Sequence, residues 1–221
     1  MHIRYRIDGV LCEVMQMPRF IEAPLLQRYR VMFNFDLATH RGKPQQGNVE
    51  IKYRDLRYEL LASATPTKWG DKLTIRILDQ NDAMCGLKKL GFTPEVQAGI
   101  EELAQRRSGL LLFAGPSRSG RSTTQYSLLN KLNSIEQNIL TIEPSNSYVM
   151  PGMSQVELRC APGLSYNSVW QAAQDVDILH IDRVMNSETA ELAMSAAERG
   201  VLTLAAVDAP NAVSGLVRMV E

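Results

Sequence analysis

The sequence predicts an α/β fold preceded by a smaller α+β domain, and three observations lead to this prediction. In residues 93–221, short and almost continuously apolar runs alternate with helical patterns. That alternation is typical of a mostly parallel sheet covered on both faces. In residues 1–79, strand-like runs instead surround a single helical pattern. Residues 79–84 are polar and lack periodicity, so we expect a linker there, between domains at 1–79 and 80–221.

The composition is that of an ordinary globular protein. Of the 221 residues, 45% are hydrophobic and 22% are charged. Because Lys+Arg 24 balances Asp+Glu 24, we expect no nucleic-acid partner. No apolar run approaches membrane-spanning length, and the N-terminal MHIRYRIDGV lacks the apolar core of a signal peptide. The three scattered cysteines form no CxxC pair, which favours a reducing compartment. We therefore expect a cytoplasmic protein without membrane insertion.

The N-terminal domain begins with a predicted hairpin. Two strand-like runs, His2–Ile7 and Val10–Met15, flank Asp8–Gly9, and an Asp-Gly pair in this setting is a strong hairpin signal. Apolar residues at helical spacing predict a helix within Pro24–Asp36. The remaining predictions are a polar loop at His40–Gly47 and strands at Asn48–Tyr53, Arg57–Ser63 and Lys72–Leu78.

The second domain begins with a well-marked helix. Thr93 is its predicted N-cap, Pro94 is its first residue and Glu95 lies in its first turn. Strands and helices then alternate. We predict strands at Leu110–Ala114, Asn138–Ile142, Asp177–Ile181 and Val201–Val207, and helices at Ser122–Asn133, Ser165–Gln174, Ser187–Arg199 and Pro210–Val220.

The stretch Leu110–Thr124, LLLFAGPSRSGRSTT, has the parts of a phosphate-binding loop. An apolar strand leads into a loop bounded by two glycines, and a helix follows. Such a loop turns its backbone N–H groups inward, and the helix N-terminus adds partial positive charge. We therefore expect a nucleotide phosphate as the ligand. The candidate nucleotide-binding residues are Gly115, Ser117, Ser119, Gly120, Arg121, Ser122 and Thr123.

Two acidic residues near strand ends are candidates for catalysis. Asp182 follows the strand Ile178–Ile181 and is a candidate Mg²⁺ ligand together with the Ser122 hydroxyl. The alternative for Asp182 is an ion pair with Arg183 or Arg121. Glu143 is a candidate catalytic carboxylate, although a polar residue at a strand end needs no such role. We interpret His180, which lies inside an apolar strand, as a core histidine.

Seven segments occur in a specific order along the chain. They are RYRIDGVL at Arg4–Leu11, PQQG at Pro44–Gly47, SATPTKWGDKLTIRIL at Ser63–Leu78, GPSRSGRSTT at Gly115–Thr124, TIEPS at Thr141–Ser145, DVDILHIDRVMNSETAELAMSAAERG at Asp175–Gly200 and LTLAAVDAPNAVSGLVRM at Leu202–Met219. Together they resemble the cytoplasmic secretion ATPases of type II secretion and type IV pilus machines. The resemblance implies a RecA-like P-loop NTPase domain that binds ATP or ADP with Mg²⁺. It also implies ring-shaped hexamers, in which the N-terminal domain helps to clamp a neighbour's nucleotide.

The departures from the family pattern fall on the chemistry. Arg121 stands where the family's phosphate-binding loop has its lysine, and Arg118 stands where that loop has a glycine. Arg183 stands where the family has the glutamate that positions the attacking water. Pro144 stands at the aspartate of the family motif TIEDP, and Asp208 stands at the histidine of the family motif LHTND. Arginine is longer and forked, so it cannot occupy the channel of a lysine in the same way. Reversal of the glutamate removes a carboxylate that phosphoryl transfer needs.

Departures also occur in the N-terminal domain. Two family arginines are replaced by Asn48 and Leu61, whereas Arg76 is retained. We interpret a further group of arginines as a solvated face, which in the family can line a subunit interface: Arg4, Arg6, Arg28 and Arg30.

Together the sequence features predict a secretion-ATPase-like protein that binds ATP but hydrolyses it poorly or not at all. The alternative is an active ATP-hydrolysing motor of secretion or pilus assembly or retraction, using Glu143 or Asp182. The expected partners are other subunits of such a machine, in a homo- or hetero-oligomer. The expected location is the cytoplasm, including the inner face of the membrane.

Overall fold

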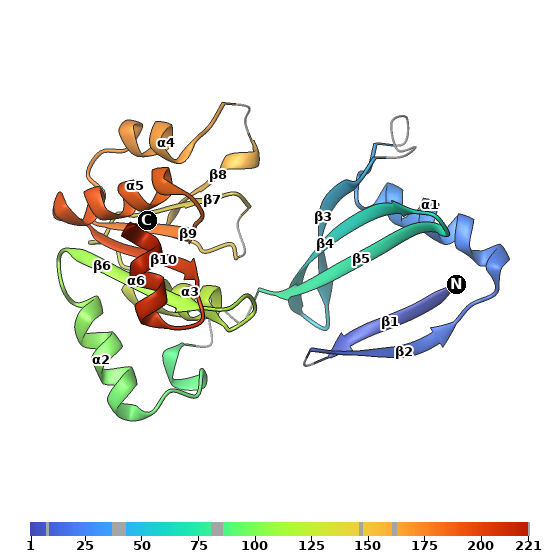
Figure 1. Cartoon of the computed structure of the whole chain (residues 1–221), viewed down its shortest axis with the longest axis horizontal. Coiled ribbons are helices and arrows are strands. Elements are labelled where there is room, and N and C mark those ends of the chain that lie inside the picture. Colours follow the sequence, from blue (N-terminus) through green and yellow to red (C-terminus); the bar gives the residue numbers. More distant parts are fainter. Residues whose placement is uncertain (8, 37–42, 81–85, 146–147, 161–162, 221) are drawn as a thin grey trace. The chain divides into compact units, whose positions relative to one another are not determined.

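Figure 1 shows the computed structural model of the chain, which describes residues 1–7, 9–36, 43–80, 86–145, 148–160 and 163–220. The chain divides into two compact units, Met1–Asp79 and Gln80–Glu221, each of which packs mainly within itself. Most of the predicted linker, residues 81–84, lies outside the described residues. That the two units are independent domains stays a prediction.

The first unit contains a hairpin and a three-stranded sheet with one helix (Figure 1). Both sheets are antiparallel, and the strand order of the larger one is β3-β4-β5. The elements are β1 (His2–Ile7), β2 (Val10–Gln16), the 3₁₀ helix η1 (Arg19–Ile21), α1 (Glu22–Met32), β3 (Gln45–Tyr53), β4 (Leu56–Thr67) and β5 (Gly70–Asp79). The predicted hairpin, helix and three strands are confirmed.

The core of the first unit lies on one face of the three-stranded sheet. Alternate residues of β4, Leu60 and Ala62, pack with Phe33 at the end of α1. A Cβ atom at Gly47 would lie 2.1 Å from the backbone oxygen of Phe33, so only glycine fits there. The predicted polar loop is wrong at Gln45–Gly47, because these residues pair with Ala62–Ala64 and extend β3.

The second unit is a five-stranded, wholly parallel sheet in the order β6-β10-β9-β7-β8. This mixed α/β architecture with a parallel sheet confirms the predicted fold class. The elements are η3 (Leu87–Lys89), α2 (Pro94–Ala104), β6 (Gly109–Gly115), α3 (Arg121–Leu132), β7 (Ile139–Glu143), β8 (Ser154–Glu157), η4 (Leu158–Cys160), α4 (Tyr166–Ala172), β9 (Ile178–Val184), α5 (Ser187–Glu198), β10 (Leu202–Asp208) and α6 (Ala212–Val220).

Helices cover both faces of the parallel sheet (Figure 1). Because side chains alternate along a strand, neighbouring residues join different cores. Leu140 and Leu179 pack with residues of α4, α5 and α6 on one face. Ile139 and Ile178 pack with residues of α2 and α3 on the other. Strands β7 and β9 therefore contribute side chains to both cores.

Two details of the second unit differ from the sequence prediction. Strand β8 was not predicted, because SQVE is short and polar and carries no apolar run. Strand β9 continues to Val184, so Asp182 and Arg183 lie within the strand and not after it. Pairing of Val184 with Val207 of β10 holds this extension in the sheet.

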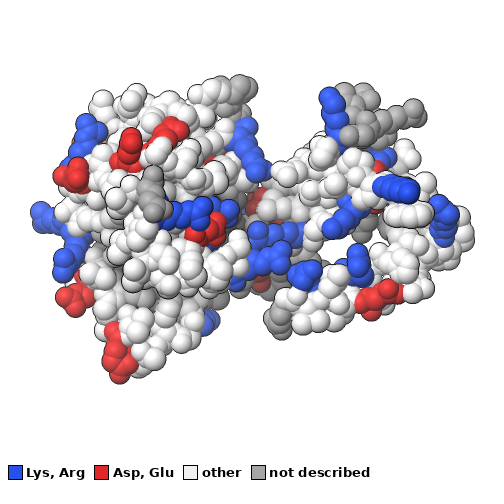
Figure 2. All heavy atoms as spheres, viewed as in Figure 1, with Lys and Arg blue, Asp and Glu red and all other residues white. Residues whose placement is uncertain are grey.

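The surface charge of the second unit is mixed. Figure 2 shows positive and negative side chains interspersed over the face of this unit that is in view. Within the described residues, no helix has both the length and the apolar character needed to cross a membrane.

The division into two units predicts where a protease cuts first. Lys88 and Lys89 are exposed in η3, directly after the unit boundary. We expect brief trypsin treatment to cut at this pair and to release two fragments that resist further digestion. Mass spectrometry of the fragments measures this. The double variant Lys88→Gln, Lys89→Gln is the control and should lose the early cut. A first cut within the helices and strands of the parallel-sheet region, at Lys131 in α3 for example, would contradict two independent domains.

Candidate nucleotide-binding site

The candidate site lies at the carboxyl edge of the parallel sheet, where the ends of neighbouring strands meet. Gly115 ends β6 and lies directly across from Asp208 at the end of β10. Asp182 lies near the end of β9, and Glu143 ends β7. In open parallel sheets, ligands bind at this edge. The topology therefore brings the phosphate-loop candidates and both acidic candidates to one edge.

The glycine-bounded loop makes a tight turn after β6. The Ser119 N–H donates to the Pro116 carbonyl at 3.2 Å, which closes a four-residue turn. Arg118, the third residue of that turn, has a φ of 69°, a conformation that favours glycine. A Cβ atom on Gly115 would lie 2.5 Å from Ser119 Oγ. The loop thus folds back on its first glycine and has a non-glycine residue in a strained conformation.

Helix α3 begins directly after the loop, with Gly120 as its N-cap at a φ of 92°. The Thr124 N–H and hydroxyl both donate to the Gly120 carbonyl, at 2.9 and 3.0 Å. No side chain caps the helix in this described segment. The backbone N–H groups of Arg121, Ser122 and Thr123 precede the first helical hydrogen bond and therefore remain available to an anion.

The two candidate metal ligands are adjacent. The Ser122 hydroxyl donates to Asp182 Oδ1 at 3.3 Å, from α3 to β9. Burial, with the nearby charge of Glu143, raises the pKa of Asp182, while His180, Arg183 and the Ser122 hydrogen bond oppose the rise. A hydroxyl and a partly buried carboxylate are oxygen donors that suit Mg²⁺ with its retained waters.

The arginines of the site pair with Asp208 and not with Asp182. Arg121 Nη2 donates to Asp208 Oδ1 at 2.5 Å, and Arg183 Nε lies 3.5 Å from Asp208 Oδ2. Arg218 Nη1 donates to the backbone carbonyl of Asp208 at 2.7 Å. The alternative in which Asp182 pairs with Arg121 or Arg183 is therefore wrong. The carboxylate at the end of β10 lies closer to both guanidinium groups.

One nitrogen of Arg121 remains without a partner. The Arg121 side chain is only 10% exposed, and its Nη1 is buried without a hydrogen bond within the described structure. An unpaired guanidinium N–H in such a place is costly. Together with the helix N-terminus it fits an anionic ligand, so the residues present suit a nucleotide phosphate.

Beneath the loop lies a buried polar group that the sequence patterns do not reveal. The Tyr126 hydroxyl donates to Glu143 Oε1, and His180 Nδ1 lies 3.4 Å from the same oxygen, outside hydrogen-bond geometry. All three side chains are buried, which confirms His180 as a core residue. Burial, then the charge of Glu143, raises the pKa of Tyr126. Tyr126 follows Ser122 by one helical turn, and this spacing is the sequence feature that could have placed Tyr126 near the site.

In the first unit, the three positions that the resemblance associates with arginine lie side by side. Asn48 pairs with Leu61 across β3 and β4, and Leu61 pairs with Arg76 across β4 and β5. Asn48 Nδ2 donates to Glu59 Oε1 at 3.0 Å, and Arg76 is exposed. Of the three neighbouring positions at which the resembled family has arginines, this chain thus keeps an arginine at one, Arg76.

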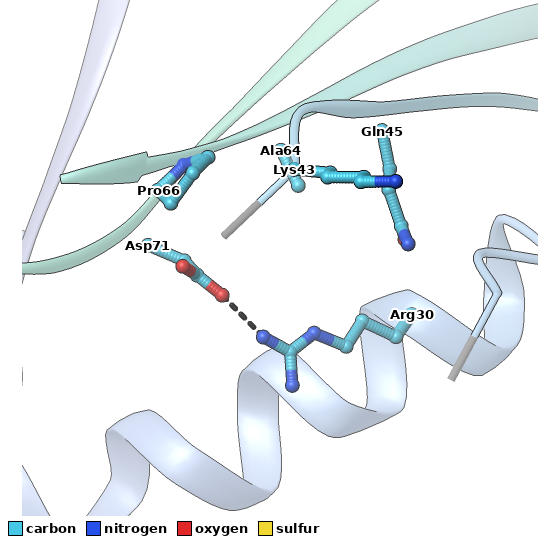
Figure 3. Close-up of a pocket in the computed structure, with 6 residues that line it drawn as sticks. All are labelled: Arg30, Lys43, Gln45, Ala64, Pro66 and Asp71. Carbon is cyan, nitrogen blue, oxygen red and sulfur yellow. Dashed lines mark hydrogen bonds and ion pairs between the residues drawn. The ribbon is translucent and has the colours of Figure 1, made fainter. Parts of the chain in front are cut away.

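Arg30 has a structural role. It extends from α1 and forms an ion pair with Asp71 at the start of β5 (Figure 3). The side chains are only 22% and 27% exposed, so Arg30 is not part of a solvated face. The pair connects the helix to the sheet. It also lines a small pocket with Lys43, Gln45, Ala64 and Pro66.

Comparison with known proteins agrees with this architecture. A family model described as "Type II/IV secretion system protein" matches residues 1–221. The chain is 33% identical over 221 residues to the type II secretion system protein HxcR of Pseudomonas aeruginosa, covering 99% of this chain and 47% of that protein. It is 34% identical over 223 residues to the type IV pilus assembly ATPase PilB of Myxococcus xanthus, covering 98% and 39%. The chain thus spans less than half the length of these relatives.

Solved structures show the same fold. The pilus retraction motor PilT with bound ADP aligns with a TM-score of 0.76 at 26% identity, covering 98% of this chain and 63% of that one. The ATPase DotB of Legionella pneumophila aligns with a TM-score of 0.78 at 17% identity, covering 99% and 64%. At that identity, the similarity to DotB shows the fold alone. On the family match and the identity to its relatives, the chain belongs to the type II/IV secretion system ATPase family.

Proposed function

We propose that this chain is a nucleotide-binding subunit of a type II secretion or type IV pilus machine in which ATP hydrolysis is impaired or lost. One observation carries the proposal. Asp208 forms ion pairs with Arg121 and Arg183, the residues that stand at the loop-lysine and glutamate positions. The groups that would act on a terminal phosphate instead interact with one another.

The nucleotide-binding role is proposed for the loop and the helix start. The backbone N–H groups of Arg121, Ser122 and Thr123, and the unpaired Arg121 Nη1, would hold phosphate oxygens. Gly115 and Gly120 allow the loop to fold back, and Ser117 and Ser119 are exposed at its surface. Bound ADP in the solved structure of PilT, which has this fold, supports the assignment.

The metal role is proposed for Ser122 and Asp182. Their side-chain oxygens are 3.3 Å apart, so both could face one Mg²⁺ ion through a direct bond or a water. When bound, the ion would neutralise charge on the phosphate oxygens.

Weak hydrolysis follows from the neighbouring groups. Arg183 offers a cation where phosphoryl transfer needs a residue that orients water. Glu143 is fully buried and accepts a hydrogen bond from Tyr126. It therefore lacks access to water at the site as folded. These two features act on the chemical step and leave phosphate binding in place.

The alternative is a slow but active motor. The Ser122–Asp182 arrangement favours it, because a carboxylate remains beside the candidate metal position. In this alternative Asp182, or Glu143 after a rearrangement, would take over the role of the missing glutamate.

Partners and location follow from the relatives. HxcR is named for type II secretion and PilB for type IV pilus assembly. By analogy, we propose that this chain works with other subunits of such a machine, as a homo- or hetero-oligomer. The location that we propose is the cytoplasm, including the inner face of the membrane.

Turnover separates the two functions. We expect the purified chain to hydrolyse ATP at background level, because Arg183 replaces the glutamate that orients water and Glu143 is fully buried. A coupled phosphate-release assay with Mg²⁺ measures this. A steady rate of about 1 s⁻¹, ordinary for an enzyme, that disappears in Asp182→Ala would establish the motor instead.

The loop arginines predict a gain of binding. We expect Arg121→Lys to tighten ADP binding by roughly tenfold, because a lysine reaches phosphates through a narrower channel. Adding Arg118→Gly should tighten it further, since glycine relieves the left-handed turn position, a strain of about 1–2 kcal/mol in other residues. Calorimetry on the three proteins decides this. Equal or weaker binding in both variants would mean that the loop has been remodelled for another use.

The metal assignment predicts opposite effects of two substitutions. Without Mg²⁺, we expect Asp182→Asn to raise the unfolding temperature, because it removes a partly buried charge. Ser122→Ala, the matched control, should lower it by removing the hydrogen bond to that charge. Both variants should lose the Mg²⁺-dependent part of ADP binding. Unaltered Mg²⁺ dependence in Asp182→Asn would exclude this residue as a ligand.

A further inference from the structure

Asp208 is fixed at the mouth of the phosphate loop by two backbone links. It pairs in register with Gly115, the first loop residue. The next residue, Ala209, donates its N–H to the Gly115 carbonyl at 3.2 Å. The backbone of Asp208 therefore cannot move away from the loop without breaking the β6–β10 ladder. Its side chain is 34% exposed, so the carboxylate remains accessible to solvent.

Arg121 reaches this carboxylate from the other end of the loop. It is the first residue of α3 and follows Gly120 directly. In loops of this kind, the residue at this position reaches the β- and γ-phosphates. Here its Nη2 is bound to Asp208 at 2.5 Å, and its buried Nη1 has no partner among the residues that the structure describes. The carboxylate thus takes half of the guanidinium that would otherwise bind the distal phosphates.

The local charges are balanced without a ligand. Arg121, Arg183 and Arg218 contact Asp208 and bring three positive charges, and the carboxyl groups at the same edge are also three, those of Asp208, Asp182 and Glu143. A nucleoside triphosphate brings about one more negative charge than a diphosphate, and brings it to the distal end of the phosphate chain. That charge would meet Asp208 at short range, where the interaction is weakly screened. The proximal phosphates would instead bind to backbone N–H groups of the loop and the helix start, and the Asp208 carboxylate does not occupy these groups.

We infer that Asp208 sets the ligand preference of this site, so that the loop takes a nucleoside diphosphate over a triphosphate. Its carboxylate stands where a third phosphate would need a cation, and it already holds the two arginines. This inference rests on the proposed nucleotide-binding function and specifies its ligand. In this inference, the Asp208 carboxylate binds Arg121 in place of the third phosphate.

The experiment compares ADP with a non-hydrolysable ATP analogue on the full chain, by calorimetry, with Mg²⁺ present. We expect the wild-type protein to bind ADP about tenfold more tightly than the analogue, the scale of one close charge near a protein surface. In Asp208→Asn, we expect affinity for the analogue to rise about tenfold and affinity for ADP to change less than about threefold. Asp177→Asn is the matched control. It removes the same charge at the amino end of β9, where Asp177 accepts from the Asn138 N–H, and should leave both affinities unchanged.

The outcomes distinguish this inference from the function on which it rests. If wild type and Asp208→Asn bind ADP and the analogue equally well, Asp208 does not select the ligand, and the nucleotide site stands. If no protein binds either compound, both the nucleotide site and the inference are overturned. A second variant, Asp208→Ser, removes the charge without an amide, and thermal unfolding shows whether each variant is folded. A gain for the analogue in Asp208→Ser alone would still support the inference, and a gain in neither folded variant would overturn it.

Discussion

The site depends on strand β10 lying between β6 and β9. Residues Leu202–Val207 of this strand are buried, and its hydrogen-bond ladder joins β6, which leads into the candidate phosphate-binding loop, to β9, which carries Asp182. Because all these strands are parallel, their carboxyl ends reach one edge together. Gly115, Asp182 and Asp208 come from distant parts of the sequence and owe their proximity to this ladder. Any substitution that shifts the register of β10 would therefore disturb the loop, the candidate metal position and the arginine pairs at once.

The unusual residues of the site form a mutually compensating set. An arginine at position 121 alone would leave an unneutralised, largely buried guanidinium at the helix start. A second arginine at position 183 would add repulsion. Asp208 neutralises both arginines, because its carboxylate oxygens lie 2.5 Å from Arg121 Nη2 and 3.5 Å from Arg183 Nε. The three residues therefore stabilise one another, and any one of them without the others would leave an unpaired charge at the site. Under the proposed function, the same pairing separates binding from hydrolysis, because the arginine charges stay neutralised while Arg183 stands where phosphoryl transfer needs a residue that orients water.

Many of the helices and strands could be predicted from the sequence, because local residue patterns specify them. The apolar runs, the Asp8–Gly9 hairpin signal and the Thr93 cap each specify structure over a few residues, and the corresponding elements are present. What could not be predicted depends on partners that are distant in the chain. Gln45–Gly47 look like a loop and become strand only through β4. Arg121 and Asp208 are 87 residues apart, and nothing local indicates that this arginine prefers Asp208 to Asp182. Tyr126 has the helical spacing of a core residue, and only the fold shows that its hydroxyl reaches Glu143.

The short strand β8 bears on how the protein behaves at high concentration. Among the described strands it ends the parallel sheet on one side, with only the four residues SQVE, three of them polar. An open sheet edge is a template on which another chain can add a strand, and long apolar edges lead to aggregation. Four residues offer few backbone groups for such pairing, and Glu157 brings a charge to the end of the strand. The feature that hid β8 from sequence patterns thus also protects the sheet from self-association through this edge.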